Sequence, residues 1–355
     1  MLLSILPALD DTSSESFTSV LQLVESFKKQ LNNDSHFWQC LFLCIITSPD
    51  KRMGALEWCN KNLPSFNESS KTQDEQSEAE KIDPQARKEA ILASLPEEAK
   101  ATITPEPGLL LRALCEGLKD CNVLVQRGFF DLLLSRIPLH SDVLQVLTTP
   151  QDRETLILYA AGTVLLKDMS LNRRLWNWLL GPEQSDGQST VFSHSTAASI
   201  TSIEQVVKSP MDRLQYFETY GVQNLTTALF SLIKGTANSQ SVTNQRIEAC
   251  KICVAIMDKW EIGQLIVPKV LIPILKVTKE TFENGSEEDF LNLLKHATAL
   301  FDSIETMNIW SDVYKMAKEG NVDLILFILR NYNVEDEDMM VTHIPLNLLA
   351  SISSN

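Results

Sequence analysis

The chain has 355 residues, a formal net charge of −15 and only 12 glycines. This acidic balance disfavours DNA, RNA or an anionic membrane as a direct partner, since each of these needs a basic face. The low glycine count argues against a β-sandwich or an α/β enzyme with many tight turns. Seven cysteines without the spacing of a disulfide framework indicate a reducing compartment. No apolar run approaches the roughly 18 residues that span a bilayer, and the start lacks a basic signal-peptide region, so we expect a soluble cytoplasmic protein.

The N-terminal part of the chain repeats apolar residues at helical spacing. Residues 16–31 predict an amphipathic helix, and residues 36–46 predict a helix that is apolar nearly all round and therefore buried between neighbours. Ser48 and Pro49 predict the N-cap and first position of a third helix, which continues to Pro64. Three helices joined by short turns are typical of stacked helix pairs.

A polar stretch over residues 67–108 interrupts this pattern. It is rich in Glu, Ser, Gln, Lys and Asp and closes with three prolines. Such a composition cannot bury enough apolar surface to offset its ordering entropy. We therefore expect an exposed, flexible insert, in which residues 84–95 form a loose helix at most.

Helical spacing resumes at Leu109, with one helix to Leu118 and another over residues 123–137. Asp120, followed by Arg127, approximates the inner turn of a HEAT-type repeat. In that turn the aspartate caps the second helix, and the arginine ties one repeat to its neighbour. Many helical hairpins satisfy this pattern, so it is weak evidence by itself. Together with the other predicted helix pairs it favours an α-solenoid.

The segment 167–182 has the clearest helix signals in the chain. Ser170 can act as N-cap, Gly181 stands where a left-handed residue is wanted, and Pro182 blocks continuation. Apolar side chains fill one arc of this helix and polar ones gather opposite. The residues expected to anchor the segment structurally are Ser170, Leu175, Trp176, Trp178 and Arg127.

The polar side of this helix admits two interpretations. Its candidate docking residues are Asn172, Arg173, Arg174 and Asn177. In the first interpretation the arginine stems lie along the tryptophans and their heads bond loop carbonyls of the next helix pair, as solenoid arginines often do. In the second, the arginines dock an acidic or carbonyl-rich partner.

The remainder of the chain predicts a second Ser/Thr/Gln-rich insert, more helices and an acidic tail. The further helices are expected over residues 214–233, 247–260, 262–277, 287–304, 309–318 and 322–330, with Pro268 and Pro273 kinking or interrupting the third of these. The predicted fold is all-α, an α-solenoid of stacked antiparallel helix pairs of HEAT/armadillo type with two polar inserts. Its predicted parts are helical repeats 1–66, insert 67–108, repeats 109–181, loop insert 182–209, repeats 210–332 and solvated tail 333–355.

The sequence contains no motif that clearly indicates catalysis or metal binding. Cys250 and Cys253 have metal or redox spacing, but they sit mid-helix among apolar residues with no second Cys/His pair near them. They are better interpreted as small core residues. The five histidines are scattered, and no phosphate-binding or nucleophile motif occurs. We predict no enzyme activity, no cofactor and no metal.

The segment 168–181 also carries a family resemblance. Its Asp-Met-Ser-Leu-Asn-Arg-Arg-Leu, followed by Trp-Asn-Trp-Leu-Leu-Gly, is similar to the most distinctive segment of the Dopey family. Other segments resemble that family in the same order along the chain. They are Leu6-Pro7-Ala8-Leu9-Asp10-Asp11, Ile45-Ile46-Thr47-Ser48-Pro49 with Arg52, Val123-Leu124-Val125-Gln126-Arg127 with Pro138-Leu139-His140, and Asp258-Lys259-Trp260-Glu261-Ile262-Gly263, where Trp260 replaces a family proline.

This resemblance implies a non-catalytic scaffold of vesicle-mediated traffic between endosomes and Golgi, cytoplasmic and peripheral to those membranes. It implies an Arf-exchange-factor-like Golgi scaffold as partner, with links to kinesin-based transport and phosphatidylinositol 4-phosphate, and membrane association that is indirect or made through other parts. The alternative is a generic peptide-binding helical-repeat adaptor unrelated to Golgi traffic.

Family members are much longer, so we expect a fragment or short isoform. We also expect an apolar face of the first helix to be exposed and to cause self-association. That face contains Phe17, Val20, Leu21, Val24 and Phe27.

Overall fold

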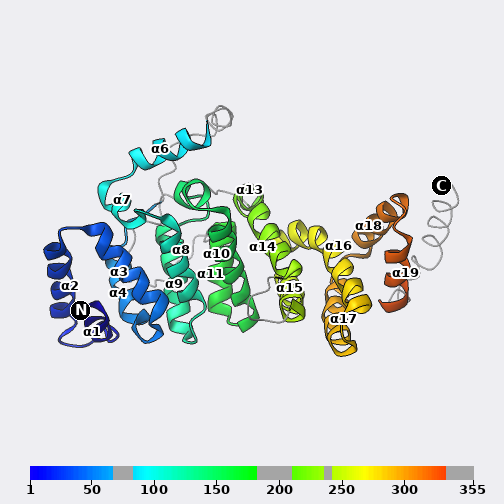
Figure 1. Ribbon diagram of the computed structural model, residues 1–355, viewed down its shortest axis with the longest axis horizontal. Coiled ribbons are helices and arrows are strands. Elements are labelled where there is room, and N and C mark those ends of the chain that lie inside the picture. The colour runs from blue at the N-terminus through cyan, green and yellow to red at the C-terminus, as the bar shows by residue number, and fades with distance from the viewer. Residues whose placement is uncertain (67–82, 182–209, 236–241, 333–355) are drawn as a thin grey trace. The chain divides into compact units, whose positions relative to one another are not determined.

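The computed structural model describes residues 1–66, 83–181, 210–235 and 242–332, and every regular element in these ranges is helical (Figure 1). The chain divides into two compact units, Met1–Asn224 and Leu225–Asn355. The predicted all-α fold is confirmed. None of the described helices is both long and apolar enough to cross a lipid bilayer.

Unit 1 is a succession of helices, and most of the connections that the structure describes are short turns. In chain order its elements are α1 (Leu2–Ile5), the 3-10 turn η1 (Leu6–Leu9), α2 (Phe17–Leu31), α3 (Asp34–Thr47), η2 (Pro49–Lys51), α4 (Arg52–Asn62), α6 (Pro84–Ser94), α7 (Glu97–Ile103), α8 (Pro107–Leu118), α9 (Val123–Arg136), the π-helical turn η4 (Val143–Leu147), α10 (Pro150–Gly162), η5 (Thr163–Leu166), α11 (Met169–Leu180) and α13 (Pro210–Tyr220).

These helices form two layers, as expected of a helical solenoid. In one layer α8 packs between α3 and α10, and in the other α9 packs between α4 and α11. Gly128 allows the close approach of α4 and α9, because a Cβ there would lie 2.3 Å from a methyl carbon of Leu56. Each pair therefore buries its apolar face against the next pair along the array.

The start of the chain corrects one expectation. In α2, Phe17 and Val24 are buried, whereas Val20, Leu21 and Phe27 are half-buried. The short elements α1 and η1, which the sequence patterns did not predict, pack against α2. The expectation of an exposed apolar face on this helix is therefore wrong for Phe17 and Val24.

The polar insert also needs correction. Residues 67–82 lie outside the described residues, and α6 matches the helix expected over 84–95. The helix α7, however, packs against both α3 and α8 and buries Ala99 and Ile103. Ser35 of α3 donates a hydrogen bond to the carbonyl of Thr104 at 2.6 Å. The insert is therefore not wholly exposed, because two apolar residues at i and i+4 suffice to dock so short a helix.

In the part of unit 2 that the structure describes lie most of α14 (Val222–Lys234) and five further helices. They are α15 (Val242–Met257), α16 (Trp260–Asn284), α17 (Glu287–Asp302), α18 (Thr306–Lys318) and α19 (Val322–Asn331). Within this unit α15 packs against α16 and α17, and α19 packs against α16 and α18.

Two helix predictions in the second half of the chain are corrected. The helix expected over 214–233 is divided at Gly221 into α13 and α14. The helix expected to be kinked or interrupted by Pro268 and Pro273 is not interrupted, because α16 runs through both of them. Buried packing of α16 on its neighbours offsets the hydrogen bonds that the prolines cannot make. The predicted loop 182–209 and tail 333–355 lie outside the described residues.

Candidate functional site

The helix α11 begins with a side-chain cap that is not the expected one. Asp168 is the N-cap, and its Oδ1 accepts a hydrogen bond from the amide of Leu171 at 2.8 Å. Ser170, predicted as the cap, is the second residue of the helix, where its hydroxyl accepts a hydrogen bond from Arg174. The preceding Lys167 adopts a left-handed conformation with φ 54°, which ends η5 and leaves Asp168 extended at the entry of α11.

The cap of α11 is also an ion-pair partner of the neighbouring helix. The guanidinium of Arg127 on α9 lies 2.7 Å from the carboxylate of Asp168. The hydrogen bond from Arg127, followed by that from the Leu171 amide, lowers the pKa of Asp168 below its ordinary value of 3.8. The inter-repeat contact expected of Arg127 is therefore made with the helix cap of the following pair.

We predict that Asp168→Asn destabilises unit 1 less than Asp168→Ala, because asparagine still caps the helix but loses the ion pair with Arg127. The depressed pKa stabilises the fold fully above the ordinary value of 3.8 and ceases to do so as the pH falls through the folded-state pKa. In thermal melts, the difference in melting temperature between wild type and Asp168→Asn should narrow as the pH falls below 3.8. A difference independent of pH would contradict this role.

The two adjacent arginines of α11 have different environments. Arg174 binds the carboxylate of Asp131 on α9 through two nitrogens, at 2.8 and 3.1 Å. Arg173 is exposed, and no hydrogen bond or ion pair joins it to the part of the chain that the structure describes. Arg174 therefore ties α11 to α9, whereas Arg173 is left to solvent. Asn172 and Asn177, the other candidate docking residues, are half-buried.

The anchoring residues of α11 lie on its inner side. Leu175 and Trp178 are buried, and the indole nitrogen of Trp178 donates to the carbonyl of Ile137 at 3.0 Å. Trp176 is only half-buried. Gly181 ends the helix with φ 78°, a conformation that favours glycine. Trp178 therefore connects α11 to the turn after α9 by both packing and a hydrogen bond.

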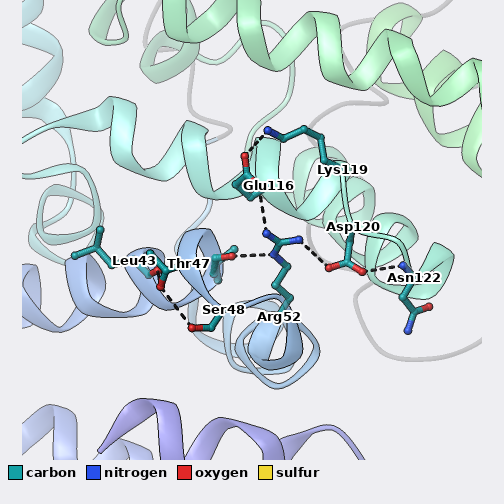
Figure 2. Close-up of polar contacts among 9 residues, drawn as sticks. Leu43, Thr47, Ser48, Arg52, Glu116, Lys119, Asp120 and Asn122 are labelled. Atoms are coloured by element: carbon teal, nitrogen blue, oxygen red, sulfur yellow. Dashed lines mark hydrogen bonds and ion pairs between the residues drawn. The ribbon is translucent and has the colours of Figure 1, made fainter. Parts of the chain in front are cut away.

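A buried arginine connects the pair α3 and α4 to the pair α8 and α9. The chemical motifs in the sequence did not reveal this contact. Arg52, at the start of α4, donates from Nε to the carbonyl of Ile45 at 2.8 Å (Figure 2). Its other nitrogens lie 3.0 Å from the Asp120 carboxylate and 3.2 Å from that of Glu116. Arg52 and Asp120 are both buried. The only sequence signal was the position of Arg52 after the Ser-Pro turn.

This contact corrects the role expected of Asp120. The N-cap of α9 is Asn122, whose side chain accepts from the amide of Leu124 at 2.9 Å. Asp120 instead receives the amide of Asn122 at 2.8 Å and the guanidinium of Arg52 (Figure 2). It therefore holds the turn before α9 and links that turn to α4, in the preceding helix pair.

Cys250 and Cys253 lie in the core of unit 2. Both are buried in α15, and burial raises the pKa of Cys250 to about 12 and that of Cys253 well above its ordinary value. Among the described residues, no group of three or more His, Cys, Asp or Glu side chains is placed to hold a metal ion. The pair is therefore part of the apolar packing of α15.

We predict that the native chain reacts with a thiol reagent much faster at Cys121 than at Cys250 or Cys253. Cys121 is exposed in the turn before α9, whereas the other two are inaccessible and remain protonated near neutral pH. Titration with an aromatic disulfide reagent should lose its fastest phase in Cys121→Ser and regain the slow thiols only in denaturant. Rapid native labelling of Cys250 would show that α15 opens readily.

Comparison with known protein families identifies the chain. A family model described as Dopey, N-terminal, matches residues 1–184, which is more than half of the chain and includes the whole of α11. The chain belongs to the Dopey family. A second model, the DOP1 middle TPR domain, matches residues 216–355. TPR repeats are also stacked helix pairs, so this match agrees with the helical packing observed in unit 2.

Two fungal members of the Dopey family are similar along nearly the whole chain, and an animal member along half of it. Protein DOP1 of Saccharomyces cerevisiae is 35% identical and protein dop1 of Emericella nidulans 33% identical, each over 99% of this chain. Protein DOP1B of Mus musculus is 28% identical over 50% of the chain. The chain spans about a fifth of the length of the two fungal relatives. No solved structure matches it.

Proposed function

We propose that this chain is part of a non-catalytic scaffold in vesicle-mediated protein traffic between endosomes and Golgi. Membership of the Dopey family supports this role. The stacking of helix pairs within unit 1 also supports it, because stacked helix pairs commonly present surfaces that bind protein partners. Three ion pairs, Arg52 with Asp120, Arg127 with Asp168 and Arg174 with Asp131, hold neighbouring helices together, which suits a structural role for these polar groups.

The observation that carries this proposal is the asymmetry of α11. Arg127 and Arg174 fix α11 to α9 through Asp168 and Asp131, and the neighbouring Arg173 remains exposed beside them. A side chain held on a fixed helix loses little backbone freedom when it binds, which favours recognition. We propose an Arf-exchange-factor-like Golgi scaffold as the partner, with kinesin-linked transport machinery further along the same assembly.

The proposal places the protein in the cytoplasm, peripheral to Golgi and endosomal membranes, with membrane association made indirectly. Imaging of the tagged protein tests this placement. Puncta that coincide with Golgi or endosomal markers are expected, and they should persist when lipid binding is competed but disperse when the scaffold partner is depleted. A diffuse cytosolic signal would instead favour a generic peptide-binding adaptor unrelated to Golgi traffic.

A further inference from the structure

Three large apolar side chains are exposed together where α9 and α11 begin. The exposed fractions are 60% for Leu124, 52% for Leu166 and 87% for Met169. Leu124 lies one helical turn before Arg127, and Met169 directly follows Asp168, so the 2.7 Å contact between Arg127 and Asp168 brings these parts of the two helices together. Single exposed apolar residues are common, but a group of them marks an interaction surface.

The charge around these side chains is positive, although the whole chain carries −15. Lys167, between Leu166 and Asp168, is exposed, and Arg173 lies one turn after Met169 on the same side of α11. The neighbouring carboxylates of Asp131 and Asp168 are already neutralised by arginines. The two exposed cations therefore have no compensating charge among the contacts that the structure describes around them.

We propose that this surface, termed the α9–α11 patch and made of Leu124, Leu166, Lys167, Met169 and Arg173, docks an acidic segment of a partner protein that carries apolar side chains. The proposal rests on the scaffold function proposed above and names the chemistry of its partner. Apolar groups of the partner would cover the leucines and Met169, whose flexible thioether adapts to different shapes. Its carboxylates would pair with Lys167 and Arg173.

An anionic membrane is the less favourable occupant. Charges on the surface are screened over about 8 Å at physiological ionic strength, so a narrow peptide lying on the patch experiences mainly its two cations. A bilayer is wider than the patch and would also face the acidic surroundings of a chain with net charge −15. Two cations attract an anionic bilayer too weakly for stable attachment, which needs a cluster of basic residues.

The test uses the 355-residue chain and a fluorescent peptide of about 16 residues, composed of leucines at helical spacing with glutamates elsewhere. Fluorescence anisotropy should show binding that weakens as salt rises from about 50 to about 500 mM. The same peptide with lysine in place of glutamate should not bind, although the net charge of the chain would favour it. Binding of the lysine peptide alone, or of neither peptide, overturns the proposal.

Three variants locate the binding. Lys167→Glu with Arg173→Glu should weaken it at least about tenfold, and Met169→Ser should weaken it while the salt dependence persists. The matched control is Arg87→Glu with Lys88→Glu, which makes the same charge change on the exposed surface of α6 and should leave binding unchanged. An equal loss of peptide binding in the control variant would contradict the assignment of binding to the α9–α11 patch. All three should keep the wild-type melting temperature, since the substituted side chains are exposed.

Two further readouts separate this proposal from others. Vesicles rich in anionic lipid should not sediment the chain, and sedimentation that Lys167→Glu with Arg173→Glu abolishes, without peptide binding, would assign the patch to a membrane instead. In cells, wild-type localisation of this double variant would reject the docking role of the α9–α11 patch but would not contradict the proposed trafficking function. Peptide binding by a protein that is diffuse in cells would retain the patch and reject the trafficking function.

Discussion

Replacing Trp178 with alanine should lower the free energy of unfolding of unit 1 by about 3–5 kcal/mol. Its side chain is buried, and its indole nitrogen donates to the carbonyl of Ile137, so the variant loses packing and leaves that carbonyl without its partner. Because the chain has two units, the measurement should be hydrogen exchange of α9 and α11 amides, which reports on unit 1 alone.

The matched variant is Arg173→Ala, five residues earlier on the same helix. Its side chain is exposed, so the free energy of unfolding should change by no more than about 0.5 kcal/mol. Trp178→Phe should fall between the two, since it keeps part of the packing and loses the hydrogen bond. Should Arg173→Ala open α9 and α11 as much as Trp178→Ala does, Arg173 holds the repeats together and its docking role fails.

Replacing Arg52 with methionine should also cost about 3–5 kcal/mol, because it leaves the buried carboxylate of Asp120 without its cation. Methionine keeps much of the arginine stem, so the loss reports on charge more than on volume. Hydrogen exchange of α4 and α9, the helices that meet beside this contact, measures it.

Two further variants separate charge from packing at this position. Adding Asp120→Asn to Arg52→Met should recover about half of the loss, since the amide is neutral and still accepts from the backbone of Asn122. Lys119→Met removes another cation paired with Glu116, but a half-exposed one, and should cost at most about 1 kcal/mol. Equal costs for Arg52→Met and Lys119→Met would mean that the buried pair does not hold the two helix pairs together.

The helices themselves could be predicted because apolar spacing records which face of each helix is buried. The spacing of residues 36–46 predicted α3, and Gly181 marked the end of α11 through a conformation that other residues seldom adopt. The short helices α1 and α7 were missed because two or three apolar residues do not establish a period. The prolines of α16 left open from sequence whether the helix is kinked or interrupted. The structure shows that it is not interrupted, because buried packing offsets the hydrogen bonds that the prolines cannot make.

The candidate site was only partly predictable, and the reason is the same at each position. Ser170 and Asp168 are both able to cap a helix, and the left-handed turn at Lys167 selects Asp168. Arg173 and Arg174 both fall on the polar side of α11, and only the position of Asp131 on α9 decides which of them is bound.

The sequence by itself determined that this protein has an all-α fold, that it resembles the Dopey family, and that α11 buries Trp178 on its apolar side. The tertiary structure alone decided the partners of its charged groups. Arg52 and Asp120 are 68 positions apart, and Arg127 and Asp168 are 41 apart. Hydrophobic periodicity specifies which face of a helix is buried, but it carries no information on which neighbouring helix supplies the opposite charge. That choice depends on how the helix pairs stack, and the stacking also leaves Arg173 exposed.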